Sequence, residues 1–112
     1  MLKLILTQGY AFNTNDHNRV YSFKVYNEDD SPFDASGYDA PIIEVFNDVG
    51  CLVLLPITGI WTTQASGVGS FTFASTNYLR LIGSHYIMVQ LVKPGTIVGT
   101  ERRRITVFSN FS

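Results

Sequence analysis

The sequence predicts an all-β fold, namely an antiparallel β-sandwich of about seven to eight strands with one short helical turn. Apolar and polar residues alternate over several short segments, which is the period of a half-buried strand. Glycine, proline, asparagine and aspartate cluster between these segments, where turns require them. No segment repeats apolar residues at helical spacing over more than two turns, and this argues against a helical domain.

Three strands are predicted in the first half of the chain. A polar, asparagine-rich loop at residues 10–18 separates the first from the second, and a connection rich in turn formers at residues 28–41 separates the second from the third. The predicted strands, with the side chains that each turns inward, are residues 2–7 (Leu2, Leu4, Leu6), 19–27 (Tyr21, Phe23, Val25) and 42–47 (Ile43, Val45).

A hairpin and a further strand follow. Asp48-Val49-Gly50 has the composition of a tight hairpin turn, so residues 51–55 are predicted to pair back on the preceding strand until Pro56 ends the pairing. Residues 57–63, which include Trp61, are predicted to form the next strand.

The second half of the chain is organised around residues 67–92. In the strand predicted at its start, Phe71 and Phe73 share one face. Residues 76–81 then change from a period of two to the spacing of about one helical turn. Gly83 follows, and it permits a backbone conformation that branched residues resist.

Residues 86–92 contain a single polar side chain, Gln90, and are therefore apolar on both faces. Such a strand belongs at the centre of a sheet, or lies against a second layer or a partner. A Lys93-Pro94-Gly95 turn joins it to the last long strand, residues 96–108, so that the two form a hairpin.

The order of strand, one-turn crossover, Gly83, Tyr86 and strand resembles the corner that joins the two sheets of an immunoglobulin-like sandwich. In that interpretation Tyr86 is the corner tyrosine. The alternative is a core tyrosine whose hydroxyl lies at the rim. With 112 residues the chain makes one domain, so we predict one immunoglobulin-like β-sandwich over residues 1–112.

Charge is sparse and unevenly distributed. Charged residues make up 15% of the chain, below the roughly one quarter of a typical domain, which indicates either a subunit that hides surface in an assembly or a sparsely charged surface. Residues 1–50 carry eight acidic against three basic side chains, a balance of −5, and residues 51–112 carry one against five, a balance of +4. A dipolar subunit can stack head to tail or dock on a charged scaffold, unless the two halves interleave and the asymmetry averages out.

Several classes of protein are disfavoured. The net charge of −1 gives no bulk basicity for nucleic acid, and no run approaches the roughly twenty apolar residues of a membrane span. The first residues lack the apolar run of a secretion signal. Cys51 is the only cysteine, which fits folding in a reducing cytoplasm, and its apolar neighbours predict an inert buried thiol.

No motif for catalysis, cofactor or metal is found. His17 and His85 have no partner at metal-ligand spacing, and one cysteine excludes the zinc signatures. The acidic loop around Asp29 and Asp30 lacks the spacing of a calcium loop, so a solvated loop is favoured over weak calcium binding. There is no nucleophile elbow and no dinucleotide fingerprint. We therefore expect a protein that is not an enzyme and binds no cofactor.

Arg102-Arg103-Arg104 is the only basic run. On a strand alternate side chains face opposite ways, so at most two of these arginines share a face. Stacking of single-stranded nucleic acid on Phe108 and Phe111 is one interpretation, and a solvated edge that deters aggregation is another. As a functional role we favour a salt bridge between subunits, from these arginines to the acidic loop.

Three local features resemble the immunoglobulin-like domains of tailed-phage virions, closest to the N-terminal domain of phage baseplate upper proteins. The first is the strand at residues 19–26 followed by the acidic turn that ends Pro-Phe-Asp-Ala-Ser-Gly37. The second is the pair of predicted strands around Asp48-Val49-Gly50. The third is Gly69-Ser-Phe-Thr-Phe, which is followed by the Gly83 to Tyr86 corner and an apolar strand.

The resemblance implies a structural subunit of the virion that acts through protein–protein contacts, with other virion proteins and further copies of itself as partners. Because the chain ends at Ser112, without the coiled-coil or receptor-binding parts of that family, we expect a baseplate, tail, collar or head-decoration component that is assembled in the host cytoplasm. The expected interface residues are Arg102, Arg104, Asp29, Asp30, Phe108 and Phe111.

Two other classes stay open at this stage. A carbohydrate-binding or adhesin-type module would stack sugar rings on Trp61, Tyr10 and Tyr38. An enzyme inhibitor or anti-host factor that is made alone would need neither the virion nor a glycan.

Overall fold

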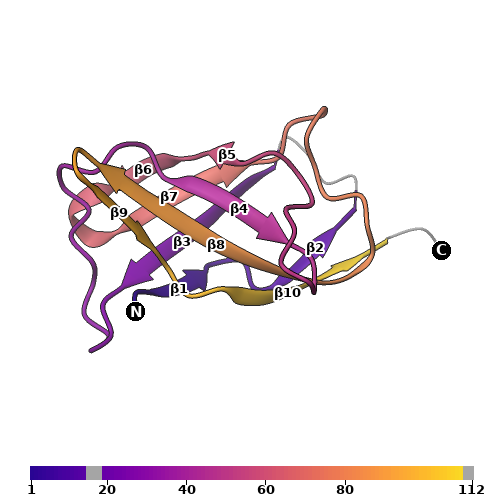
Figure 1. The fold of residues 1–112 in the computed structure, drawn as a ribbon, viewed down its shortest axis with the longest axis horizontal. Helices are drawn as coiled ribbons and strands as arrows, with labels where there is room; N and C mark the ends of the chain where they lie inside the picture. Colours follow the sequence, from indigo (N-terminus) through magenta and orange to yellow (C-terminus); the bar gives the residue numbers. More distant parts are fainter. Residues whose placement is uncertain (15–18, 110–112) are drawn as a thin grey trace.

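The computed structural model, which describes residues 1–14 and 19–109, is a sandwich of two β-sheets (Figure 1). One short 3-10 helix, η1 (Gln64–Ser66), lies among the described residues. The strands are β1 (Lys3–Leu6), β2 (Ala11–Asn13), β3 (Val20–Tyr26), β4 (Ile42–Phe46), β5 (Ile57–Thr58), β6 (Ile60–Thr63), β7 (Val68–Thr72), β8 (Gly83–Lys93), β9 (Thr96–Gly99) and β10 (Arg103–Phe108).

The two sheets differ in size. The first has four strands in the order β1-β3-β7-β6, and the second has the order β2-β10-β8-β4-β5, with β9 also paired to β8. All strand pairs are antiparallel except β2 with β10, which run parallel. Figure 1 shows β8 running along the sandwich between β4 and β10. The strand that is apolar on both faces therefore lies at the centre of its sheet, as predicted.

Alternating side chains from both sheets form the core. Every inward residue predicted for β1, β3 and β4 is buried, except Leu2, which packs at the edge of the core. Aromatic rings fill the space between the sheets, where Tyr21 stacks on Phe71 at 5.5 Å and Phe12 meets Phe73 edge to face at 6.1 Å. These ring pairs add specific geometry to the burial of apolar area.

The chain changes sheets at Gly59, which separates β5 in the second sheet from β6 in the first. A Cβ at this position would lie 2.6 Å from the carbonyl oxygen of Ser70 and 2.9 Å from Cδ1 of Ile43. The N–H of Gly59 donates to the carbonyl of Pro41 at 2.7 Å. The crossing is therefore close to the backbone of both sheets, and only glycine fits there.

The predicted strand at 96–108 is divided by a bulge between β9 and β10, both of which pair with β8. At the division Thr100 is buried, and its Oγ1 accepts the N–H of Val89 at 3.0 Å. The N–H of Glu101 donates to the carbonyl of Leu2 at 2.8 Å, so the bulge also holds the first strand. A side-chain oxygen here replaces a backbone acceptor of the ladder.

Several local predictions are wrong. Residues 76–81 are irregular after a turn that the isolated Ala74–Asn77 bridge closes, and the helical turn lies instead at η1. The turn predicted at Asp48-Val49-Gly50 is present, but residues 51–55 form no strand and make only one isolated bridge, Phe46 with Leu52, because the chain leaves the sheet there. The loop predicted at 10–18 contains β2, which lies beside β10 because Gly9 has a φ of +95° and redirects the chain. Its residues 15–18 lie outside the described residues.

Two residue assignments are corrected as well. Tyr86 lies within β8 on the face opposite the core, since its register partners are Phe46 and Arg104, so it is not a corner tyrosine. His85 takes the core side and is buried. Cys51 is exposed, because the hairpin turn carries it beyond the end of β4.

Gly59 and Gly99 offer a matched pair of glycine substitutions. Gly59→Ala should lower the free energy of unfolding by roughly 1–3 kcal/mol, because the new methyl meets fixed backbone. Gly99→Ala should cost less than about 1 kcal/mol, since its nearest obstacle is the mobile Cε of Met88 at 2.7 Å. Urea unfolding of both variants measures the difference, and equal losses would contradict the close crossing at Gly59.

The exposure of Cys51 can be measured directly. An aromatic disulfide reagent should titrate one thiol per folded chain, at a rate within about tenfold of that of a free thiol, because no apolar cover shields the sulfur. The same titration in urea gives the reference rate. A native thiol that reacts only after unfolding would contradict the position of the turn.

Candidate protein interface

The three arginines of the basic run divide between the two faces of their sheet. Arg102 reaches across to the Phe46 ring, with its guanidinium carbon 4.0 Å from the ring centroid. Arg104 lies on the same outer face and donates from Nη2 to Oγ of Ser84 at 2.9 Å. Arg103 points the other way, toward Tyr10, and lies 3.7 Å from Glu101. Two of the three therefore share a face, as predicted.

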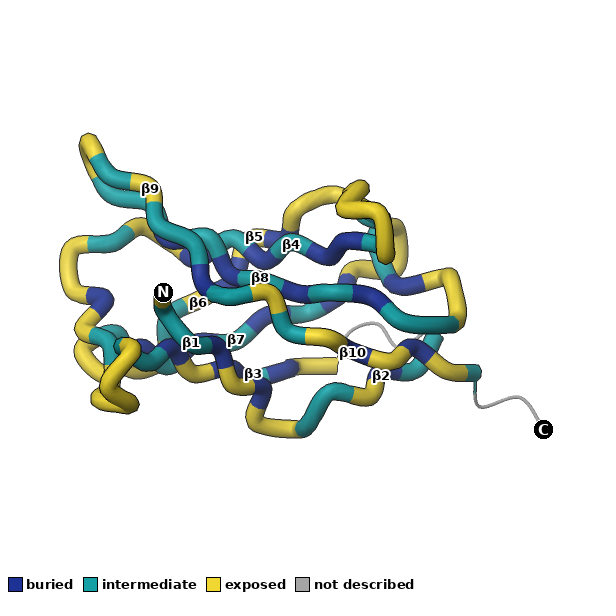
Figure 2. The backbone as a smooth tube through the Cα atoms, turned by 60° about the horizontal axis from the view of Figure 1, so that its bottom comes forward, coloured by how far each residue is buried: buried dark blue, intermediate teal, exposed yellow. Residues whose placement is uncertain are grey.

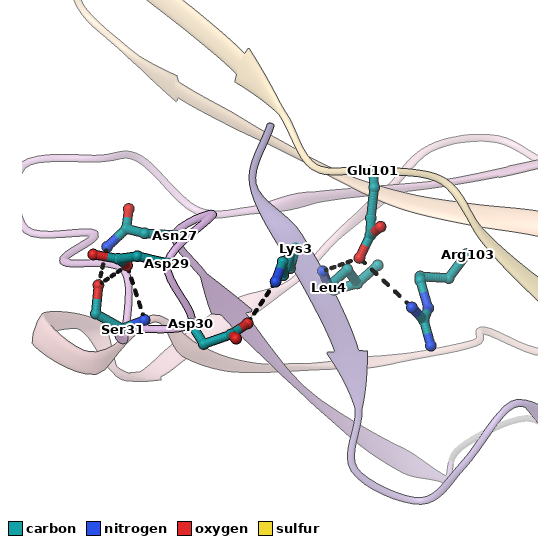
Figure 3. Close-up of polar contacts among 8 residues, drawn as sticks. All are labelled: Lys3, Leu4, Asn27, Asp29, Asp30, Ser31, Glu101 and Arg103. Carbon is teal, nitrogen blue, oxygen red and sulfur yellow. Dashed lines mark hydrogen bonds and ion pairs between the residues drawn. The ribbon is translucent and has the colours of Figure 1, made fainter.

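The acidic loop is held by contacts within the chain. Asp30, which has a φ of +68°, accepts the Nζ of Lys3 at 2.6 Å (Figure 3). Asp29 accepts the N–H of Ser31 at 3.0 Å and also its hydroxyl. These hydrogen bonds hold the pKa of the Asp29 carboxyl below its ordinary value of 3.8, and the bond from the Ser31 hydroxyl contributes most. Neither aspartate meets Arg102 or Arg104 in the monomer.

A charged groove of about 340 Å³ lies beside this loop, lined in part by Tyr10 and Tyr26. Its charges are paired with one another. Oε2 of Glu101 accepts the N–H of Leu4 at 3.2 Å and faces Arg103 (Figure 3). Glu101 and Arg103 therefore have a structural role, because they join β1 to the bulge between β9 and β10.

The remaining candidates for chemistry are also used by the fold. Nδ1 of His85 lies 3.2 Å from the carbonyl of Gly83, and His17 is outside the described residues. Within residues 1–14 and 19–109 no three histidine, cysteine, aspartate or glutamate side chains form a metal-binding group. Among those residues, no helix is long and apolar enough to cross a membrane.

The three aromatic residues proposed for sugar stacking have protein partners. Nε1 of Trp61 donates to the carbonyl of Asp39 at 2.8 Å, and the ring packs on Phe23. Tyr38 contacts Phe33 and the Nζ of Lys93, and Arg103 lies over the ring of Tyr10.

One end of the sandwich gathers exposed apolar side chains. The loops that connect β4 to β5 and β7 to β8 meet there, and Figure 2 shows both as largely exposed. Five side chains in them are between 46% and 81% exposed, and we call this set the apolar end: Val49, Leu52, Leu55, Leu81 and Ile82. They are five of the eleven large apolar side chains that are exposed in the described part of the chain.

Two shallow hollows shape the apolar end. One, of about 450 Å³, is lined by residues 52–56 and by Tyr78 and Arg80. The other, of about 400 Å³, lies between residues 47–49 and 81–85. Phe108 is at the same end, because Val107 pairs with Gly83, and it is 38% exposed. Phe111 lies outside the described residues.

The sequence analysis missed the apolar end because it assigned residues 51–55 to a strand and 76–81 to a helical turn. Both assignments imply that half of the apolar side chains are buried. A usable signal was present in Leu81-Ile82, since two adjacent apolar residues that lead into a strand point to opposite faces and cannot both be buried in the core.

No protein-family model and no curated protein matches the sequence. Among solved structures, CopC from Methylosinus trichosporium OB3b aligns with a TM-score of 0.54 and 12% identity, over 100% of this chain and 98% of its own. The endo-beta-1,4-mannanase from Thermotoga petrophila aligns with a TM-score of 0.55 and 11% identity, over 98% of this chain but 20% of its own. The Lin-41 filamin domain aligns with a TM-score of 0.47 and 10% identity, over 96% and 91% of the two chains.

At these identities the similarity shows the fold alone. The chain is an immunoglobulin-like β-sandwich, in agreement with the fold predicted from the sequence.

The hydrogen bonds to Asp29 predict a pH dependence of stability. The pKa of Asp29 is lower in the folded than in the unfolded chain. The stability that these hydrogen bonds contribute is therefore present above about pH 4 and is lost as the pH falls through the pKa of the folded state. Asp29→Asn should therefore be less stable than the wild type at about pH 6, and the gap should narrow toward about pH 2.5. Ser31→Ala, which removes the hydroxyl that lowers the pKa most, should give a change of the same sign. A gap that widens in acid would contradict this account.

Proposed function

We propose that this chain is a non-enzymatic structural subunit of a tailed-phage particle, and that it acts by contact with other virion proteins and with further copies of itself. It would be assembled in the host cytoplasm and remain in the virion. The observation that supports a contact role is the apolar end, where five exposed apolar side chains gather on two adjacent loops. The resemblance of the strand at residues 19–26, and of the acidic turn that follows it, to phage virion domains is the reason for proposing a phage particle.

The apolar end is suited to binding a protein. An exposed apolar patch on a small domain typically marks an interaction surface. Burial of such a surface stabilises a complex by about 25 cal/mol per Å² of apolar area. Arg80, which lies over the ring of Tyr78, is at the rim, where a charged group favours orientation over affinity.

A contact role is preferred over the carbohydrate-binding alternative for a physical reason. Sugar-binding rings present a free flat face, whereas Arg103 lies over the ring of Tyr10, Lys93 lies over that of Tyr38, and the ring of Trp61 packs against Phe23. The apolar loops, in contrast, have none of the described strands over them, and each of the five side chains is exposed.

The proposal predicts where the chain is found and which surface keeps it there. Quantitative mass spectrometry of purified particles should detect the wild-type chain in a fixed number of copies per particle. Leu81→Gln with Ile82→Gln should lower that number by at least about tenfold, because two buried apolar side chains are lost from the contact.

A matched control uses apolar residues of similar exposure elsewhere. Val20→Gln with Ile60→Gln changes side chains of β3 and β6, in the four-stranded sheet, that are 58% and 67% exposed. This double variant should leave incorporation unchanged. Absence of the wild-type chain from particles would contradict the virion role. Equal incorporation of both double variants would contradict the assignment of the surface.

A further inference from the structure

The outer face of the second sheet is apolar along its centre. Ile43 of β4 pairs with Val89 of β8, and both side chains face the core. The residues that alternate with them along each strand therefore face outward. The apolar side chains on this outer sheet face are Ile42, Phe46, Tyr86, Met88, Val92 and Ile97, and the polar Gln90 of β8 lies among them in register with Ile42. Phe46 is buried beneath the guanidinium of Arg102, and the other five are half-buried or exposed. A central strand with apolar side chains on its solvent side is unusual in an antiparallel sheet, where that face is ordinarily polar.

Charges flank this apolar stripe with opposite signs. On the β4 side, Glu44 pairs in register with Met88. On the β10 side, Arg104 pairs with Tyr86, whereas Arg102 reaches across the face to the Phe46 ring of β4. Glu44 is half-buried and forms no ion pair with any described residue. Glu44 on β4 and Arg104 on β10 therefore lie on opposite sides of a mainly apolar centre.

We propose that a second copy of this chain packs on the outer sheet face, with a two-fold axis parallel to β8. Rotation about such an axis exchanges the two flanks, so β4 of one copy lies over β10 of the other. Glu44 then lies near Arg104 of the other copy, and this contact occurs twice in each dimer. An interface of this kind is self-complementary, as two-fold symmetry requires. Aligned packing of two sheet faces is a standard arrangement.

The size of the face indicates a weak, reversible dimer. With about 3.4 Å per residue along a strand and about 4.8 Å between strands, the face covers on the order of 600 Å² per copy. This is near the lower limit of specific interfaces, so we expect a dissociation constant of roughly micromolar size. The inference rests on the proposed contact role and names one of its partners.

Complementary charge reversal tests the arrangement. In Glu44→Arg, the introduced arginine faces Arg104 of the other copy, and in Arg104→Glu, the introduced glutamate faces Glu44. Sedimentation of each variant alone should show a dissociation constant at least about tenfold above that of the wild type, because like charges then face each other. A one-to-one mixture of the two variants should dimerise again, since both contacts in the mixed dimer join opposite charges.

Lys24→Glu is the matched control, because Lys24 is exposed on β3 in the other sheet, and it should leave dimerisation unchanged. Thermal unfolding confirms that each variant is folded. A wild-type chain that stays monomeric to about a millimolar, or variants that fail to recover on mixing, would overturn the inference. A dimer that forms in solution while particles lack the chain would instead overturn the proposed function and leave this inference standing.

Discussion

The structure depends on the pairing of β8 (Gly83–Lys93) along both of its edges. Its backbone bonds β4 on one side and the interrupted β9–β10 arm on the other. Its inward residues, from His85 to Leu91, close the core against the aromatic rings of the other sheet. Because β8 is paired on both edges and packed against the core, the positions of its outward side chains are fixed. A specific binding surface requires such fixed positions.

Charged groups serve mainly to hold the irregular connections. Lys3 with Asp30 ties the acidic loop to β1, and Glu101 ties β1 to the bulge at Thr100. Exposed ion pairs of this kind contribute little to stability but fix the geometry of loops. The charges that remain on the outer sheet face, with Glu44 on β4 and Arg104 on β10, are then available to orient a partner.

The alternation of apolar residues was enough to predict the fold and most of the core, because a period of two determines which side chains a strand buries. It did not predict where the chain changes sheets. Gly59 and Gly9 do so through contacts and dihedral angles that no local pattern reveals. The apolar end was missed for the same reason, since Leu55 and Ile82 look like core residues until the loops that carry them are seen to leave the sheets.

The central claim is that the outer side of β8 is a contact surface. The chain has two methionines, Met88 on that face and Met1, which is 74% exposed at the start of the chain. NMR spectra of the protein with ¹³C-labelled methionine methyl groups, recorded across a dilution series, test the claim directly. The account predicts that the Met88 methyl signal shifts with concentration while that of Met1 does not. A Met88 signal that is unchanged over the whole series would contradict it.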